Sequence, residues 1–316
     1  MIEEDVDVQA ERLVQALDNL RDGETAVVAL VALGARSIDP LRRFLLRGRP
    51  GPVYQPRRWA VQALGSLDAK EVLVEYLTSL PHIPDPQVRF AEEVVQNAAV
   101  REFVRWPDAE TTAFLLDLSR KKKLVGLAEV FGKLRQVEAI PYLDRALEDD
   151  CIRQSAEEAL IAIGEQAREA LILSSTVKLP VNDVEIPSSL RRRQSVLRVL
   201  AKIGIRPQDW PKLSPLIWER DPEIVVESCV LAVAAGILDN RETVAARLLA
   251  VSERAPWFLE EDIVECLLEW FEAAQPAIEA EIDHLKKLPE TDWIRNERLR
   301  LLLRVKGRAQ PRTPAI

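Results

Sequence analysis

One pattern recurs along most of the chain: an apolar helical segment, a glycine, a short turn and a second apolar helical segment. Six glycines mark the pattern: Gly34, Gly65, Gly132, Gly164, Gly204 and Gly236. They are spaced by about 32 residues, apart from two wider gaps. Apolar residues at i, i+3, i+4 and i+7 give each helix a stripe that must be buried. Because two helices cannot bury both stripes alone, the units must stack.

The wider gaps are consistent with the same unit. Between Gly65 and Gly132 lies one repeat without a glycine, around "EEVVQNAAVREFV", and one more period past Gly236 falls near Trp270. The spacing predicts about eight helical-hairpin repeats. They would cover residues 23–305. Alternating runs of Val, Ile and Thr do not occur, so we expect an all-α protein without β-sheet.

Three segments depart from the repeat. Residues 1–22 read as one amphipathic capping helix, with Val8, Val14 and Leu20 among its inward residues. The proline-bearing insertion "SSTVKLPVNDVEIPSS", residues 174–189, predicts a long loop, and residues 306–316 lack periodicity and predict a disordered tail. Within the array, we expect Leu143 and Ile161 to be buried.

The stretch "VEAIPYLDRALEDDCIRQSAEEALIAIGEQAREALI", from Val137 to Ile172, shows the unit most clearly. It has an Ala-Ile-Pro-x-Leu start to one helix, an acidic turn followed by Arg153, and an Ala-x-x-Ala-Leu-x-x-Ile-Gly run that ends at Gly164. These units resemble HEAT repeats, especially the short bacterial HEAT-like repeats of the phycobilisome-lyase type. The resemblance covers roughly residues 24–285. It implies an α-α superhelix, a HEAT-repeat solenoid whose second helices line a concave surface.

Composition narrows the cellular context. The net charge of -8 argues against a general nucleic-acid coat but permits a local basic patch. No apolar run of about 18 residues occurs, so we expect no membrane span, and the acidic start "MIEEDVDVQAERLV" does not resemble a secretory signal. Cys151, Cys229 and Cys266 lie in apolar helical patterns and are predicted to be buried reduced thiols. These features predict a cytoplasmic protein, and the resemblance to the short bacterial repeats implies a bacterial one.

Catalytic motifs are missing from the sequence. His82 and His284 are far apart, and neither has a second His or Cys at metal-ligand spacing. The His-Glu pairs of HEAT-type di-iron enzymes, a glycine-rich phosphate loop and a Gly-x-Ser-x-Gly turn do not occur. We therefore expect no enzymatic activity, no metal and no cofactor, with a hidden carboxylate pair as the open alternative.

Arginines gather between residues 36 and 58, where Asp39 is the only acid. The set is Arg36, Arg42, Arg43, Arg47, Arg49, Arg57 and Arg58. The loop "GRPGPVYQP" places Tyr54 beside them. A row of guanidinium groups next to an exposed aromatic ring suits phosphate, carboxylate or acidic-peptide binding. Alternatively, these arginines pair with acids of the next repeat.

A second basic run, Arg191, Arg192 and Arg193, starts the helix after the predicted loop. Cations oppose the positive end of a helix dipole, so this placement favours a binding role. In contrast, residues 257–283 carry acids and no basic residue, which predicts a solvated cap or a patch for a basic partner. The predicted partner-binding residues are Arg42, Arg43, Arg47, Arg49, Tyr54, Arg57, Arg58, Arg191, Arg192 and Arg193.

Three functions fit these features. The first is a non-enzymatic scaffold or adaptor that binds a partner protein with an acidic segment on its concave face. The repeat subtype alone implies the second, a HEAT-like bilin lyase or tetrapyrrole-handling factor. The third is a nucleic-acid binder resembling the HEAT-like alkylpurine DNA glycosylases, which would need aromatic side chains for an unstacked base. Trp59, Trp106, Trp210 and Trp218 are its candidates, unless they are buried between helices.

Overall fold

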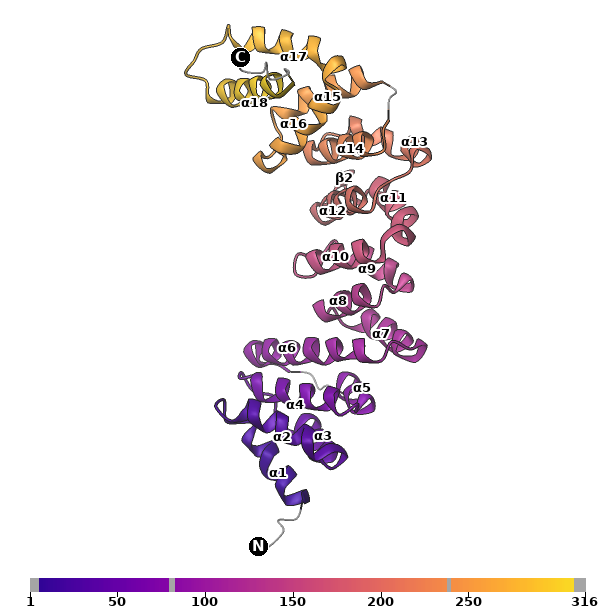
Figure 1. The fold of residues 1–316 in the computed structure, drawn as a ribbon, viewed down its shortest axis with the longest axis vertical. Coiled ribbons are helices and arrows are strands. Elements are labelled where there is room, and N and C mark those ends of the chain that lie inside the picture. Colours follow the sequence, from indigo (N-terminus) through magenta and orange to yellow (C-terminus); the bar gives the residue numbers. More distant parts are fainter. Residues whose placement is uncertain (1–5, 80–82, 238–239, 310–316) are drawn as a thin grey trace, which may run out of the picture. The chain divides into compact units, whose positions relative to one another are not determined.

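The computed structural model describes residues 6–79, 83–237 and 240–309, and the protein is all-α (Figure 1). Two short strands are the only β-structure in these ranges. None of the helices described there is both long enough and apolar enough to cross a membrane. The chain divides into two compact units, called here unit 1 (residues 1–142 and 154–162) and unit 2 (residues 143–153 and 163–316).

Unit 1 is a series of stacked helix pairs. Its helices are α1 (Val6–Ala16), α2 (Gly23–Leu33), η1 (Gly34–Ser37), α3 (Ile38–Arg47), α4 (Gln55–Ser66), α5 (Lys70–Thr78), α6 (Pro86–Glu102), η2 (Phe103–Arg105), α7 (Ala109–Lys121), α8 (Val125–Lys133) and η3 (Val137–Ala139). Two further helices complete the middle of the chain, α9 (Ile140–Ala146) and α10 (Arg153–Ile163). Helix α4 packs between α2 and α6, and α8 packs against the other side of the series on α6. Helix α3 packs against α4, and α5 packs against both α4 and α6.

Unit 2 continues the alternation but contains an insertion. Its elements are η4 (Gly164–Ala167), α11 (Arg168–Thr176), β1 (Pro180–Val181), β2 (Val184–Glu185), α12 (Pro187–Ile203), η5 (Pro207–Asp209), α13 (Trp210–Leu213), η6 (Ser214–Trp218), α14 (Pro222–Ala234), α15 (Arg241–Ser252), η7 (Trp257–Leu259), α16 (Glu260–Glu269), α17 (Phe271–Leu285) and α18 (Trp293–Ala309). Helices α12, α14, α16 and α18 pack in succession. Buried side chains such as Leu248, Leu267 and Leu302 form a continuous core under α14 to α18.

Four of the six repeat glycines end their helices with positive φ, as the repeat pattern predicts: Gly34, Gly164, Gly204 and Gly236. Gly132 differs, because its helix continues and Arg135 takes the positive φ instead. A Cβ on Gly132 would lie 2.7 Å from the Cα of Ala159, so glycine is needed there for close helix packing. Gly65 likewise has no positive φ, and Asp68 adopts it.

Aspartates before proline begin two of the first helices. The side chain of Asp85 accepts hydrogen bonds from the backbone N–H groups of Gln87 and Val88, and Asp221 accepts one from Ile224. Each aspartate is followed by proline at the first helical position, where the missing N–H has no consequence. Asp85 and Asp221 are therefore the N-caps of α6 and α14.

Several boundaries differ from the sequence prediction. The first helix ends at Ala16, and Val8 and Leu20 are exposed although Val14 is buried. Leu143 is buried as predicted, but Ile161 is exposed on the outer side of α10. At the other end, α18 continues to Ala309, so residues 306–309 of the predicted tail are helical. Residues 1–5 and 310–316 lie outside the described ranges.

The predicted loop at 174–189 contains a β-hairpin, which the sequence analysis did not anticipate. Val181 pairs with Val184 and Pro180 with Glu185, in antiparallel register. Asn182 and Asp183 form the turn with φ values of 50° and 62°. Positive φ at both central residues suits the right-handed twist of a two-residue hairpin, and Asn and Asp tolerate it well. Helices α11 and α12 extend into both ends of the predicted loop.

Ion pairs join neighbouring helix pairs in unit 1. Arg101 on α6 donates to a carboxylate oxygen of Glu129 on α8 at 2.9 Å. Lys70 on α5 lies 3.1 Å from a carboxylate oxygen of Asp108, which also caps α7. The partners of each pair therefore come from successive repeats.

Candidate functional site

The predicted arginine row on α3 is largely neutralised by acids. Arg42 forms two hydrogen bonds with Glu75 on α5, at 2.7 and 2.9 Å, and Arg43 pairs with Glu11 on α1. The ion pair and hydrogen bonds from Arg42 lower the pKa of Glu75. Arg42 and Arg43 thus form ion pairs with acids of neighbouring helices, the alternative to a binding role that the sequence suggests.

Arg57 is buried and structural. Its guanidinium donates to both carboxylate oxygens of Glu92 on α6, at 2.7 and 2.9 Å, and the Tyr76 hydroxyl donates to Glu92 at 2.6 Å. Burial, followed by the negative charge of Glu92, raises the pKa of Tyr76. Arg57 is 5% exposed, and its guanidinium is occupied by Glu92 inside unit 1.

The remaining residues of this region do not line one pocket. Arg47, Arg49, Tyr54 and Arg58 are exposed at the end of α3, in the following loop and on α4. The nearby cavity of 700 Å³ between α1 and α3 contains none of them. It is lined by Asp7, Val8, Glu11, Ala35, Arg36, Ile38, Asp39, Pro40 and Arg43, so its acids outnumber its arginines. The structure thus shows no concentrated basic groove here among the described residues.

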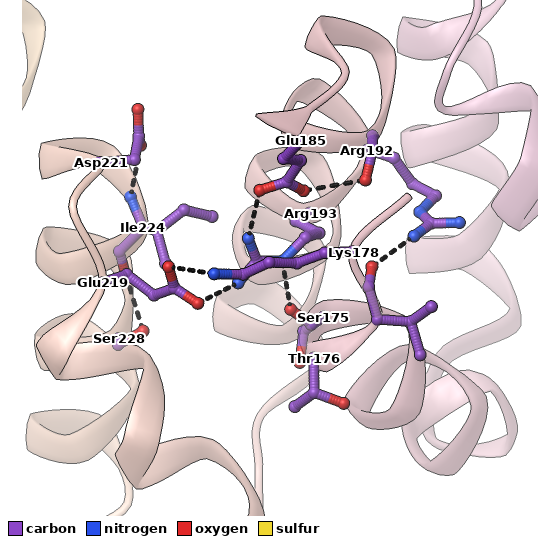
Figure 2. A network of polar contacts seen from close by, with 12 residues as sticks. Ser175, Thr176, Lys178, Glu185, Arg192, Arg193, Glu219, Asp221, Ile224 and Ser228 are labelled. Carbon is purple, nitrogen blue, oxygen red and sulfur yellow. Dashed lines mark hydrogen bonds and ion pairs between the residues drawn. The ribbon is translucent and has the colours of Figure 1, made fainter. Parts of the chain in front are cut away.

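Arg193 is at the centre of a buried polar network in unit 2 (Figure 2). Its side chain is 1% exposed and donates to the carbonyl oxygen of Ser175 at 2.7 Å. It also donates to Glu185 on β2 and to Glu219 after η6, both at 2.9 Å. One guanidinium therefore connects α11, the hairpin and the segment that precedes α14.

Its two neighbours are also engaged. Arg192 is buried, donates to the carbonyl oxygen of Val177 at 2.7 Å and pairs with Glu148 at 3.2 Å. Arg191 lies 3.3 Å from Asp150. The carbonyls of Ser175 and Val177 are at the C-terminal end of α11, where a helix dipole attracts cations. The arginines that oppose the dipole of their own helix therefore complement that of its neighbour, and Arg192 and Arg193 are not free for a partner.

Further contacts hold the hairpin in place. Lys178 reaches Glu219 at 2.6 Å (Figure 2). The Ser189 hydroxyl accepts from the backbone N–H of Leu179 and donates to Glu185 at 2.8 Å. Burial opposes ionisation of Glu219, but its contacts with Lys178 and Arg193 lower its pKa overall. The carboxylate is therefore charged at neutral pH, and the hairpin is tied down by ion pairs on its inner side.

A groove of 870 Å³ lies between the second helices α11 and α13, and we call it the α11–α13 groove. Its lining is Gln166, Glu169, Ala170, Ile172, Leu173, Thr176, Lys212, Pro215, Leu216 and Glu219. Leu173 is 66% exposed there. The hairpin starts beside this groove, because Lys178 contacts Glu219 of the lining.

The hairpin itself presents apolar side chains outward. Val181 and Val184 are 59% and 69% exposed, and Val177 and Leu179 are also exposed. Trp218, next to Glu219 in the chain, is exposed as well. Several exposed apolar side chains on one short segment are typical of a protein-binding surface rather than of a solvated face. The sequence analysis read this segment as a loop and did not assign these residues a role.

Within the ranges that the structure describes, no three His, Cys, Asp or Glu side chains are grouped to hold a metal ion. His82 lies outside those ranges.

Two of the three cysteines, Cys229 and Cys266, are buried as predicted. Burial raises the pKa of Cys229 to about 12. Cys151 differs from the prediction, because it is exposed in the turn after α9.

The tryptophans of the nucleic-acid hypothesis are dispersed. Trp59 is buried against Gly23, Trp106 donates its indole N–H to Asp68, Trp210 is half-buried and Trp218 is exposed. Trp59 and Trp106 lie in unit 1, Trp210 and Trp218 lie in unit 2, and none of the four lines one of the described cavities.

One buried carboxylate was not foreseen. Glu227 on α14 is 7% exposed, and Asp262 on α16 lies near it. Burial, followed by the charge of Asp262, raises the pKa of Glu227 to about 7. Glu227 lies three residues after Ile224 and four before Leu231, both fully buried, so it is on the core side of α14.

Comparison with known proteins yields no relative: no protein-family model matches the chain, and no curated protein has significant sequence similarity to it.

Proposed function

We propose that the helix pairs are HEAT-like repeats of a solenoid and that unit 2 binds a partner protein at the α11–α13 groove and the adjoining hairpin. The groove lies between second helices, which the resemblance to HEAT repeats predicts to be on the concave face. One observation carries the proposal: apolar side chains remain exposed on a hairpin whose inner side is fixed by the buried Arg193.

The cost of burying Arg193 supports this. Removing a cation from water is unfavourable unless several partners compensate for it. Here Glu185, Glu219 and the Ser175 carbonyl do so, and all of them hold the insertion in one conformation. A rigid surface loses less conformational entropy on binding, so it binds more tightly for the same contacts.

The groove favours a segment with apolar side chains. Leu173 and Leu216 line it, and of its charged residues Glu219 is already paired with Arg193 and Lys178. A partner with an acidic segment remains a proposal for the region around Arg47, Arg49 and Arg58, which are exposed. Nothing at the groove specifically favours a tetrapyrrole or a nucleic acid.

The test is quantitative affinity capture from the source cell with the full chain and two variants. Leu173→Lys places a charge in the groove without opposing the dipole at the end of α11. Val28→Lys is the matched control, because Val28 is an equally exposed apolar residue on α2 of unit 1. We expect a set of proteins captured by the wild type and by Val28→Lys to be lost with Leu173→Lys.

A purified candidate from that set should then bind the wild type in calorimetry and bind Leu173→Lys at least tenfold more weakly. Both substitutions are at exposed positions, so both variants should melt within a few degrees of the wild type. If Leu173→Lys and a Val181→Asp, Val184→Asp double variant both retain every captured protein, the proposal is wrong.

A further inference from the structure

A second cavity in unit 2 lies between η7 and the first turns of α18. Its volume is 390 Å³, within the range of roughly 300–1,000 Å³ that is usual for ligand pockets. Trp257 and Trp293 line it and remain open to solvent, with exposed fractions of 85% and 71%. Phe258 packs edge-to-face against Trp257, and Pro256 and Ile294 add apolar lining. We call this cavity the tryptophan pocket.

The carboxylates of the pocket are already engaged. Glu253 pairs with Arg298 at 3.0 Å, and Glu260 pairs with Arg300 at 3.4 Å. Glu297 also pairs with Arg300, at 2.6 Å. The acids at this end of the chain are therefore balanced by arginines of α18, and the pocket does not select its ligand by charge.

The hydrogen-bond donors of the pocket are free, in contrast. Within the part of the chain that the structure describes, the indole N–H groups of Trp257 and Trp293 have no acceptor. Each indole therefore offers an open ring face and one donor. A complementary ligand has apolar surface and carbonyl acceptors but few N–H donors. Proline-rich segments have these properties, because proline lacks an N–H group and the preformed polyproline II helix loses little entropy when it docks against aromatic rings.

The chain itself contains such a segment. After Ala309, where α18 ends, the sequence continues "QPRTPAI", with Pro311 and Pro314 at Pro-x-x-Pro spacing. A polyproline II helix has about three residues per turn, so prolines three positions apart lie on the same edge and can contact one aromatic surface together.

The segment is too short to place both prolines in the pocket of its own chain. Helix α18 has 17 residues, so Ala309 lies about 24 Å from Trp293 at a rise of about 1.5 Å per residue. Pro311 follows Ala309 by two positions and can lie at most about 7 Å from it. The pocket is at the opposite end of α18 from the segment, so a docked pair of prolines must come from another copy of the chain.

We propose that the Pro-x-x-Pro segment of one copy docks in the tryptophan pocket of a second copy, and that the exchange is reciprocal. Pro311 and Pro314 lie against the rings of Trp257 and Trp293, and carbonyl oxygens of the segment accept from the indole N–H groups. A two-fold axis that sets the two α18 helices antiparallel brings the end of one beside the start of the other. The proposal is independent of the α11–α13 groove, because the two cavities share no lining residue.

The first test measures docking of the segment by fluorescence anisotropy. A labelled peptide of residues 308–316 is added to the full chain that carries Pro311→Ala and Pro314→Ala, so that the chain's own segment does not compete. The control peptide has alanine at both proline positions. We expect the proline peptide to bind roughly tenfold more tightly than the alanine peptide, or better, because only the former has the preformed helix and the two rings.

Substitutions in the pocket identify the binding site. Trp257→Ala and Trp293→Ala should each weaken binding of the proline peptide by about tenfold or more, as is typical of a tryptophan at the centre of an interface. Trp293→Phe keeps a ring but removes the donor, so its loss should be smaller. Phe90→Ala is the matched control, because Phe90 is an exposed aromatic residue on α6 of unit 1, and it should have no effect. Circular dichroism melting verifies folding, and Trp257→Ala carries the test if the Trp293 variants are unstable.

The second test measures exchange between copies by sedimentation velocity. The wild type should form a dimer as its concentration rises. At a concentration where the wild type is dimeric, Trp257→Ala and the Pro311→Ala, Pro314→Ala double variant should each be monomeric. Mixed together with one of them labelled, they should form a heterodimer, because one intact segment then meets one intact pocket.

Several results would overturn the proposal. If the two peptides bind equally well, or neither binds, the pocket does not recognise the prolines. If folded tryptophan variants bind the proline peptide as tightly as the unsubstituted pocket does, the segment docks elsewhere. If the peptide binds but the wild type stays monomeric and the mixture yields no heterodimer, the occupant is a proline-rich segment of a different protein and not of a second copy.

Discussion

Replacing Glu227 with glutamine should stabilise the protein at pH 8 much more than at pH 4.5. The carboxylate is buried on α14, close to Asp262 on α16 and to Glu223 one turn away, with Arg198 and Lys202 of α12 as the neighbouring cations. Burial is the largest cause of its raised pKa, ahead of the repulsion from Asp262. Between pH 4.5 and about 7, the Glu227 side chain is therefore protonated in the folded state and ionised in the unfolded state.

The sign and size follow from that shift. A group whose pKa is raised on folding stabilises the folded state below its unfolded pKa, and this contribution is lost as the pH rises through the folded pKa. For Glu227 the window runs from 4.5 to about 7, which corresponds to roughly 3 kcal/mol at about 1.4 kcal/mol per pKa unit. Glutamine does not ionise, so Glu227→Gln should avoid this loss. The burial-raised pKa of Asp262 adds a pH dependence of the same sign.

The assay is urea unfolding at several pH values from 4.5 to 8, followed by circular dichroism and by tryptophan fluorescence. Relative to the wild type, the free energy of unfolding of Glu227→Gln should rise by about 3 kcal/mol across this range. Glu269→Gln is the control, because Glu269 is exposed on α16, and its difference from the wild type should stay nearly constant. If the curves for Glu227→Gln and the wild type run parallel, Glu227 is not the buried acid described here.

Three further substitutions test the packing. Leu143→Ala should lower the free energy of unfolding by about 2–5 kcal/mol in urea titrations, because its side chain is fully buried; an unchanged midpoint would remove it from the core. Arg193→Met should lower the free energy of unfolding by about 3–5 kcal/mol, because Glu185 and Glu219 lose their buried partner. Limited proteolysis should then cut within the hairpin. A hairpin that is not cut would show that other contacts hold it. Gly204→Ala should cost about 1–3 kcal/mol, since its φ of 79° and ψ of 155° are accessible almost only to glycine; an unchanged melting temperature would contradict this backbone geometry.

The helices and their order follow from local rules that operate within one repeat. Apolar periodicity and the glycines predicted the helix ends at Gly164, Gly204 and Gly236, because those features depend on residues a few positions apart. The hairpin had a local signal too: "VNDV" places Asn and Asp in a two-residue turn between β-branched residues.

The roles of the arginines depend on residues one repeat away. Glu75 follows Arg42 by 33 positions, and Glu92 follows Arg57 by 35, close to the period itself. Aligning charges at this spacing could have suggested the pairs. No such rule reveals that Trp257 and Trp293 remain exposed, because periodicity shows which side chains are apolar but not which of them a neighbouring helix covers.

The ion pairs between successive helix pairs also limit which helices could be deleted from the chain or exchanged within it. Each junction between helix pairs has its own charges: Arg57 and Glu92 form a buried pair at one, and Arg101 and Glu129 form a partly exposed pair at another. Excising the helix that carries Glu92 would leave Arg57 in the interior without its carboxylate. One helix pair could therefore not be removed or exchanged without leaving a buried charge unpaired, which costs several kcal/mol.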